Sequence, residues 1–414
     1  MTACISPNSM KDLVLSPSHR CPRVWQIPWT LSRLTISGLL SVLSCTLQSC
    51  DAGSRPANHV VGRQPVRIHS PEPESVSGLS QWHLTETLRI PVTGSLEPGL
   101  IESVDDIATD KRGVIYLLDR RNKKIVQFDS RGKFVRVVPR SRILQDPIGI
   151  ATDRVGRLWI VDPAGPRYLR VDSSGEAQSF ARSVRGYSVP WRGGIAKDGQ
   201  FYDVSLTNAA GSPQEIVIYD TDLHIVRAVR IPKLSTVQTF TFGREPYTTT
   251  ASVPFTGELL WSYDGDQRIW IANSAEYSLF VLDLKGDTLN IIDRSYQSIP
   301  IKDAERDSAI RALSWFVRSG GRIAENRIPT VHPALRALFL DGNLFVWVVP
   351  RTDRDHAEAQ FDVFTSAGQL TAIVHVGRQL ITNPLPRIVN GFLYAAIKDS
   401  LGRIDIARFQ ISRK

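Results

Sequence analysis

Acidic side chains surround a single histidine in the stretch PRTDRDHAEAQ, which begins at Pro350. His356 is flanked there by Asp353, Asp355 and Glu358. Carboxylates and an imidazole at such close spacing can hold a cation or act as general acid and base. The same residues are also typical of a solvated loop with mixed charges, and the sequence leaves both interpretations open.

The familiar signatures of enzymes do not occur in this chain. It has no G-x-S-x-G nucleophile elbow, no H-E-x-x-H, no P-loop and no G-x-G-x-x-G. None of the seven histidines after Cys50 has a second histidine or a cysteine at the spacing of a metal ligand. These observations favour a binding or interaction module over an enzyme, without deciding between them.

Arginines in the predicted loops are the second source of chemistry. The planar guanidinium donates paired hydrogen bonds that match carboxylates, phosphates and sulfated sugars. Because lysines and arginines number 50 against 41 acids, solubility explains many of them. The candidates for an anionic ligand are Arg120, Arg140, Arg142, Arg167, Arg192, Arg351 and Arg378. The net charge of +9 is too small for its length to indicate nucleic acid, so the expected partner is a protein or an anionic ligand.

The chain repeats itself from Asp105 onward. DDIATDKRGVIYLLDRRNKKIVQFDSRGKFVRVV aligns with IGIATDRVGRLWIVDPAGPRYLRVDSSGEAQSFA, which begins at Ile148. Each unit contains four short runs of β-branched and aliphatic residues separated by turns rich in Asp and Gly. The first turn of the unit recurs near residues 110–113, 153–156, 197–199, 264–266, 341–343 and 390–391. The second turn recurs near residues 129–132, 172–175, 220–222, 283–286 and 365–368.

This pattern predicts an all-β fold, a six-bladed β-propeller of four-stranded blades. Strands a to d run from the innermost to the outermost strand of a blade, and the last repeat lacks strand d. The isolated strand-like segment Trp82–Ile90 alternates apolar and polar residues. We expect it to complete the last blade and close the ring, which removes exposed sheet edges. The d–a and b–c loops then gather on one face, where the candidate arginines lie.

The repeats resemble NHL-type blades, and the whole chain resembles the bacterial six-bladed β-propeller lipoproteins. In that group a Trp-x-Leu strand comes first and a helical insertion precedes blade five. Trp82-His83-Leu84 and the stretch from Ile299 to Val331 match these features. The resemblance covers Gln81 to Lys414 and is closest in the first two blades. Because functions in the group are various, the resemblance implies the architecture and little chemistry.

Propellers of the gluconolactonase type suggest the alternative function. They hold a central calcium with acids and asparagines from inner strands, and the resemblance therefore marks Glu102, Asp105 and Asp106 as possible metal ligands. No matching asparagine is identified in the other repeats. Calcium is the possible cofactor of this alternative, a metal-dependent hydrolase or lactonase-like enzyme with its site at the mouth of the channel.

Two insertions interrupt the repeats. Residues 234–257 contain aromatic side chains that either line a ligand site or anchor the loop. Residues 299–331 contain a predicted helix with Asp303 as its N-cap and Gly320-Gly321 as its stop. Its apolar stripe, which includes Phe316, packs against its own domain or forms a lid or partner surface.

The four cysteines all lie in the first 50 residues. An apolar run, Leu34 to Ser44, follows several arginines and is typical of a signal peptide. Leu47-Gln48-Ser49-Cys50 resembles a bacterial lipobox, which predicts lipidation at Cys50; Cys45 and a plain secretion signal are the alternatives. We therefore expect a signal peptide in 1–50, a flexible tether in 51–79 and the propeller in 80–414. The expected location is extracytoplasmic, periplasmic or at the cell surface, with a lipid anchor in the membrane.

Overall fold

The structure is a computed structural model. It describes residues 64–70, 79–92, 101–140, 142–165, 167–180, 191–196, 198–205, 215–232, 234, 238–244 and 247–413. These residues belong to the unit Val61–Lys414. The predicted signal peptide, Cys50 and the first part of the predicted tether lie outside the described residues. Within the described residues, none of the helices has the length and hydropathy needed to span a bilayer.

The first three blades are four-stranded antiparallel sheets in chain order. Blade one consists of β3 (Asp106–Thr109), β4 (Ile115–Asp119), β5 (Lys124–Phe128) and β6 (Phe134–Val138). Blade two consists of β7 (Gly149–Thr152), β8 (Leu158–Asp162), β9 (Arg167–Val171) and β10 (Ala177–Phe180). Blade three consists of β11 (Gly194–Ile195), β12 (Phe201–Ser205), β13 (Glu215–Tyr219) and β14 (Ile225–Arg230).

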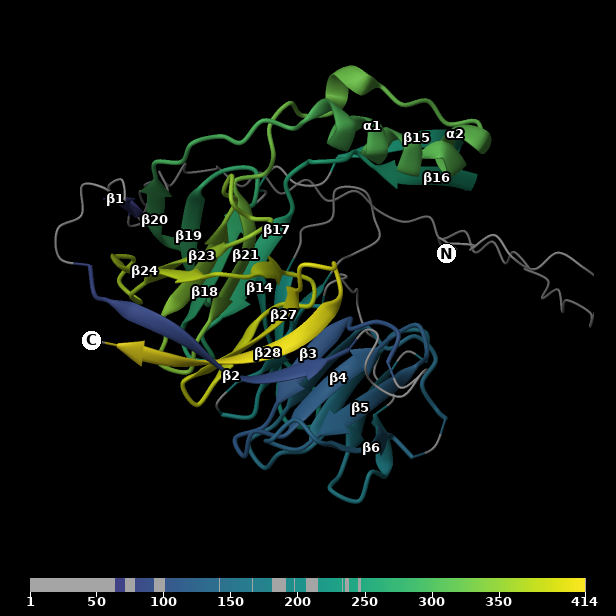
Figure 1. Cartoon of the computed structure of the whole chain (residues 1–414), viewed down its shortest axis with the longest axis vertical. Helices are drawn as coiled ribbons and strands as arrows, with labels where there is room; N and C mark the ends of the chain where they lie inside the picture. The colour runs from purple at the N-terminus through teal and green to yellow at the C-terminus, as the bar shows by residue number, and fades with distance from the viewer. Residues whose placement is uncertain are drawn as a thin grey trace, which may run out of the picture. The chain divides into compact units, whose positions relative to one another are not determined.

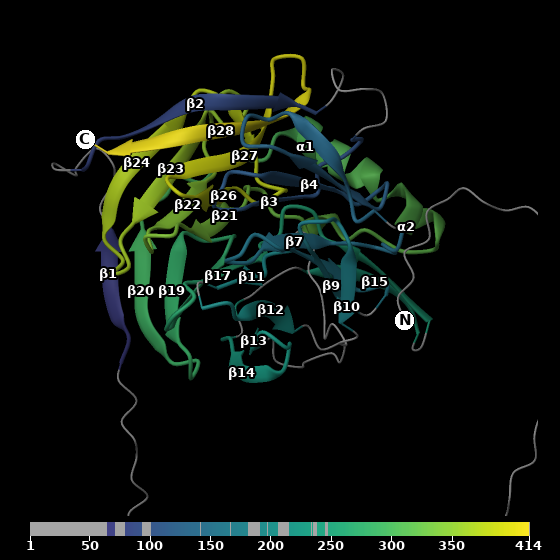
Figure 2. The same ribbon diagram turned by 90° about the horizontal axis from the view of Figure 1, so that it is seen from below.

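The last three blades follow the same plan, and the six blades together form the predicted propeller (Figures 1 and 2). Blade four contains β17 (Leu259–Tyr263), β18 (Arg268–Asn273), β19 (Ser278–Asp283) and β20 (Thr288–Arg294). Blade five contains β21 (Leu335–Leu340), β22 (Val346–Pro350), β23 (Ala359–Phe364) and β24 (Leu370–Val376). Blade six contains β25 (Gln379–Ile381) and β26 (Arg387–Val389), which both pair with β27 (Phe392–Lys398), and then β28 (Ile404–Arg413).

The predicted ring closure is confirmed. Strand β2 (Trp82–Pro91) pairs antiparallel with β28, from Trp82 opposite Arg413 to Pro91 opposite Asp405, and both views show the two strands side by side. Trp82 is buried, and its ring lies 5.0 Å from that of Phe345 in blade five. The N-terminal strand therefore completes blade six and also packs against its neighbour.

The repeated turns form because the aspartate side chain binds backbone N–H groups and the glycine adopts a positive φ. The Asp110 carboxylate accepts hydrogen bonds from the backbone N–H groups of Arg112 and Val114, and Gly113 takes a φ of +82°, which glycine adopts without strain. Blade five differs because its turn reads Asp-Gly-Asn-Leu. Leu344 there occupies the fourth position and takes a φ of +65° in place of a glycine.

Part of the predicted tether is a strand. Strand β1 (Val66–Ser70) pairs in parallel with the outer strand β20 of blade four, beside which Figure 2 shows it. The segment alternates polar and apolar residues, so Ile68 packs on the core cluster of blades four and five, while Arg67 pairs with Asp293. The prediction of a flexible tether through residue 79 is therefore wrong for this stretch.

The two insertions pack against each other. The first forms a hairpin of β15 (Thr239–Arg244) and β16 (Tyr247–Ser252). The second contains α1 (Asp303–Ala312), α2 (Ser314–Arg318) and the 3-10 turn η2 (Glu325–Arg327), so the predicted single helix is broken. Phe240 and Phe316, both buried, share one apolar cluster, and Figure 1 shows the four elements together. Phe240 of the hairpin and Phe316 of the helical stripe thus anchor the two insertions to each other, whereas Tyr247 of the hairpin is exposed.

Candidate functional site

The six innermost strands surround a central channel. Here the central channel means a cavity of about 230 Å³ lined by residues of β3, β7, β11, β17, β21 and β26 with their flanking loops. On the face of the a–b turns it continues into a wider funnel of about 1050 Å³. Thr109, Thr152 and Ile388 line both spaces. The channel is therefore open to the turn face.

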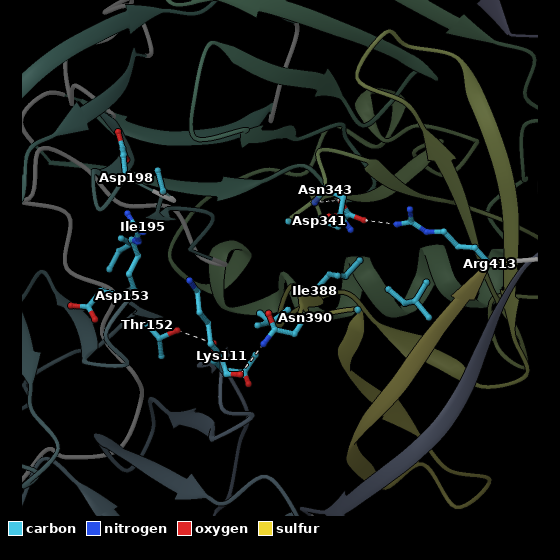
Figure 3. A pocket seen from close by; sticks show the side chains of 17 residues that line it. Lys111, Thr152, Asp153, Ile195, Asp198, Asp341, Asn343, Ile388, Asn390 and Arg413 are labelled. Carbon is cyan, nitrogen blue, oxygen red and sulfur yellow. Dashed lines mark hydrogen bonds and ion pairs between the residues drawn. The ribbon is translucent and has the colours of Figure 1, made fainter.

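Most polar groups of the turn-face funnel stabilise the fold itself (Figure 3). Asp341 accepts hydrogen bonds from N–H groups of its own turn and lies 3.6 Å from Arg413. The Arg413 guanidinium stacks 4.1 Å from the ring of Trp82. Lys111 extends into the funnel from the turn of blade one, as Figure 3 shows, and Asp198 lies across the funnel from it on blade three. The funnel is thus an entrance with mixed charge.

Two guanidinium groups line the central channel. Arg192 precedes β11 and is buried; its Nη2 lies 3.3 Å from Oε1 of Glu258, and its Nη1 has no hydrogen-bond acceptor within the described part of the chain. Burial lowers the pKa of Arg192, an effect that Glu258 opposes and that nearby Arg387 reinforces. Arg387 begins β26 and reaches Asp106 Oδ1 at 3.4 Å. The channel therefore contains two guanidinium groups, together with the acids Asp264 and Asp341 of the a–b turns.

The Asp106 carboxylate joins blades one and two. Its Oδ2 accepts a hydrogen bond from the N–H of Ile150 at 2.8 Å, and its Oδ1 accepts one from the N–H of Ile107 at 2.9 Å. Burial raises the pKa of Asp106, while Arg387 and these hydrogen bonds lower it. The oxygen atoms of Asp106 are thus engaged within the protein.

A second cavity opens on the face of the d–a and b–c loops. This loop-face pocket has a volume of about 570 Å³ and is lined by Arg336, Arg351, Lys398 and Glu258 together with polar residues. The polar lining comes from Ser252, Thr256, Ser274, Gln379, Thr382 and Asn383. Three cationic side chains from blades five and six therefore share one hydrophilic pocket.

One carboxylate holds both arginines of the loop-face pocket in place. Asp355 lies between them, 3.3 Å from Nη1 of Arg336 and 3.3 Å from Nη1 of Arg351. Arg336 also donates a hydrogen bond from Nη2 to the carbonyl of Leu380 at 2.6 Å. Burial lowers the pKa of Arg336, and Asp355 opposes this effect. Both guanidinium groups are thereby oriented before any ligand arrives.

The comparisons with known proteins concern the fold. No protein-family model and no curated protein matches the chain. A candidate exported protein of Bacteroides fragilis is 11% identical, with 84% of this chain and 100% of that chain covered and a TM-score of 0.48. A DUF4221 family member from Bacteroides vulgatus is 10% identical over 81% of this chain and 99% of that one, with a TM-score of 0.49. Virginiamycin B lyase from Staphylococcus aureus is 12% identical over 80% and 99%, with a TM-score of 0.43. Similarity at this level transfers no function.

The structure separates the arginines that the sequence grouped together. Arg192 lines the central channel, and Arg351 lines the loop-face pocket. Arg120 pairs with Asp146 at 2.7 Å, and Arg378 lies 3.9 Å from Glu86.

The remaining candidates lie outside the two cavities or cannot be placed. Arg140 is exposed beside Gly175 of blade two, and Arg142 is exposed. Arg167 begins β9, and its side chain is outside the described part of the chain.

Three cations of the two cavities were missed from the sequence. Arg336 and Arg387 lie in innermost strands, and Lys398 ends the second strand of blade six. The signal was available for Arg336, which interrupts the otherwise apolar run Leu335–Leu340. A single charge inside an inner strand has to face the channel or its mouth.

The three predicted metal ligands point to different partners. Glu102 lies 3.7 Å from Arg121, and Asp105 accepts hydrogen bonds from Ser103 and from the N–H of Arg120. Asp106 is turned toward blade two, as described above. Among the described residues, no group of three His, Cys, Asp or Glu side chains is arranged to hold a metal ion.

The acidic side chains around His356 also contact different partners and do not gather around the histidine. Asp355 faces the two arginines and caps its own turn through the N–H of Thr352. Glu358 lies 3.3 Å from Nδ1 of His375 rather than beside His356. Asp353 and His356 are exposed. This arrangement favours the solvated-loop interpretation for His356.

Asp203 in β12 is a buried acid next to the channel wall. It is 2% exposed, its Oδ1 accepts a hydrogen bond from the N–H of Val204, and the side chain of Trp191 also donates to its carboxylate. Burial raises the pKa of Asp203 from 3.8 to about 7. An acid with a raised pKa in the folded state destabilises the protein when it is ionised, and this cost disappears as the pH falls from 7 toward 4.

We therefore expect Asp203→Asn to be more stable than the wild type at pH 8. One pKa unit corresponds to about 1.4 kcal/mol, so the gain is on the order of a few kcal/mol. It should shrink steadily as the pH is lowered to 4, because the wild-type carboxyl then becomes neutral as well. Urea unfolding of both proteins between pH 4 and 8 measures the difference, and a constant difference across this range would contradict the assignment.

Proposed function

We propose that this protein is a binding module for a polar polyanion, which it holds in the loop-face pocket. The observation that supports this most directly is the meeting of Arg336, Arg351 and Lys398 around one cavity. That the propeller is exported and tethered through Cys50 stays a prediction, because Cys50 lies outside the described residues.

Charge and orientation together favour an anion. The described lining of the pocket includes one acid, Glu258, and its carboxylate is already paired with Arg192. Asp355 lies 3.3 Å from both guanidinium groups, and the Nε of Arg351 is buried without an acceptor among the described residues. A guanidinium fixed in this way loses little side-chain entropy when it binds an oxyanion.

The rest of the lining indicates what kind of anion fits. Hydroxyl and amide side chains surround the cations, and such groups hydrogen-bond to oxygen-rich ligands. A phosphate ester, a polycarboxylate or an acidic sugar presents several oxygen atoms to such a wall. The volume of about 570 Å³ lies within the roughly 300–1,000 Å³ typical of small-molecule sites. No observation among the described residues favours the metal-dependent hydrolase over this function.

Titration calorimetry of the full-length protein with citrate and with inorganic phosphate tests the proposal. We expect binding of at least one probe that weakens with added salt. Arg351→Met and Lys398→Met should each reduce the affinity about tenfold or more, because each removes a charge-assisted hydrogen bond.

Arg354→Met is the matched control for these variants. Arg354 belongs to the same loop, but its side chain is 75% exposed and lies 3.8 Å from Glu358. We expect its affinity for the probes to equal that of the wild type. If neither citrate nor phosphate binds the wild type, or if all three variants bind alike, the proposed site is wrong.

A further inference from the structure

We propose that the central channel holds a second ligand, a small carboxylate with an apolar body, bound by Arg192. This site is distinct from the loop-face pocket and does not depend on the function proposed for that pocket. The Arg192–Glu258 pair lies between the two cavities, since Arg192 lines the channel and Glu258 lines the pocket.

The first reason for placing a ligand here is that the Arg192 guanidinium is buried and incompletely hydrogen-bonded. Its side chain is 4% exposed, and its Nη2 lies 3.3 Å from Glu258, a side chain that is 45% exposed. Its Nη1 is buried, and none of the described residues offers it an acceptor. A buried charge that lacks hydrogen-bond partners is strongly unfavourable, so an acceptor in the channel would satisfy a donor that the protein leaves free.

A second guanidinium group, that of Arg387, also favours an anion in the central channel. Arg387 lines the channel with Arg192, and its contacts are long, 3.4 Å to Asp106 and 3.3 Å to the carbonyl of Ile107. The Asp106 carboxylate is already occupied by two backbone N–H groups. A bound anion between the two guanidinium groups would reduce their mutual repulsion.

The walls of the channel determine which anion fits. Apart from the arginines, the lining combines apolar and aromatic residues, among them Ile107, Ile150, Phe339, Leu385, Tyr202 and Tyr263, with hydroxyl groups and with two acids, Asp264 and Asp341. The carboxylates of these acids accept hydrogen bonds from N–H groups of their own turns. The rings of Tyr202 and Tyr263 meet edge to face at 5.3 Å. A strongly hydrated inorganic ion would lose its water here and gain nothing from the apolar part of the wall. A carboxylate on a hydrocarbon body satisfies the guanidinium and also buries apolar surface.

Size and access agree with such a ligand. The volume of about 230 Å³ is below that of sites for drug-sized molecules, so the ligand is small. It reaches the channel through the turn-face funnel, which shares lining residues with it. Lys111 extends into that funnel (Figure 3), whose mixed charge leaves the entrance open to an anion.

Benzoate and benzamide are matched probes for this site, because they have nearly the same shape and differ in charge. Calorimetric titration of the full-length protein should show benzoate binding at least tenfold more tightly than benzamide. Affinity should also rise from acetate to butyrate to benzoate as more apolar surface is buried. Equal affinity for benzoate and benzamide, a flat carboxylate series, or no binding of any carboxylate would overturn the proposal.

Variants of Arg192 identify the residue that binds. Arg192→Met should lower benzoate affinity at least tenfold and raise the melting temperature of the free protein, because it removes a buried, incompletely paired charge. Should that variant fail to fold, Arg192→Lys keeps the charge but loses the planar fork, and its benzoate affinity should fall several-fold. Unchanged affinity in the folded variant would refute the assignment.

Two controls separate this site from other arginines and from the loop-face pocket. Arg121→Met, at a side chain that is 81% exposed, should bind benzoate like the wild type. Lys398→Met should also bind benzoate like the wild type, because Lys398 lines only the loop-face pocket. A loss of benzoate binding in Lys398→Met would show that the carboxylate occupies the loop-face pocket and would overturn the channel site.

Discussion

A variant that lacks Trp82–Pro91 is expected to lose the cooperative unfolding transition of the intact chain. Strand β2 pairs with β28 along its whole length, so its removal exposes an unpaired edge in blade six. It also removes Trp82, whose ring packs 5.7 Å from Trp347 of blade five, and Ile90, which is 2% exposed. Loss of one buried large aromatic side chain alone typically costs about 3–5 kcal/mol.

Thermal unfolding followed by circular dichroism measures this effect. Deletion of Val66–Ser70 is the matched control, because β1 also lies near the N-terminus but adds a fifth strand outside a complete blade. We expect this control to keep a cooperative transition at a modestly lower temperature. If the variant without Trp82–Pro91 melts like the wild type, ring closure does not stabilise the propeller.

Arg294→Met is expected to destabilise the protein by about 3–5 kcal/mol, because it leaves a buried carboxylate unpaired. Arg294 ends blade four, and its Nη1 lies 3.1 Å from Oδ2 of Asp362 in blade five; both side chains are at most 3% exposed. The hydroxyl of Tyr277 donates to the same carboxylate. Burial raises the pKa of Asp362, and Arg294 is the main group that opposes this.

Urea unfolding distinguishes a buried pair from an exposed one. The double variant Arg294→Met/Asp362→Leu should recover much of the lost stability, because neither charge then remains buried alone. Arg403→Met serves as the control, since Arg403 is 52% exposed in its pair with Asp399 and should cost less than about 1 kcal/mol. Equal losses in Arg294→Met and Arg403→Met would contradict this account.

The turns made the blades predictable because they depend on local chemistry. Asp110 binds N–H groups two and four residues ahead, and Gly113 supplies the left-handed backbone. Both requirements fall within a few residues and recur with small variations, such as Leu344 in blade five, so they are visible in the sequence. Ring closure followed in the same way from one missing strand and one isolated strand.

The candidate site was only partly predictable, because it depends on contacts between distant blades. Arg192 and Arg351 were identified as loop arginines, but nothing local shows that Glu258 lies beside Arg192 or that Asp355, four residues from Arg351, also contacts Arg336. Arg120 has the same composition around it and is neutralised by Asp146 instead. Which arginine stays available is decided by the acid that the neighbouring loop brings to it.

The sequence by itself determined the all-β class, the six repeats, the turns and the strand that closes the ring. These features follow from hydrophobic alternation and from turn residues that lie close together in the chain. Only the tertiary structure decided that β1 joins blade four, that the two insertions pack together, and that Arg336, Lys398 and Arg387 reach the cavities. These features depend on side chains that meet across the ring from positions far apart in the sequence. No local pattern records that proximity.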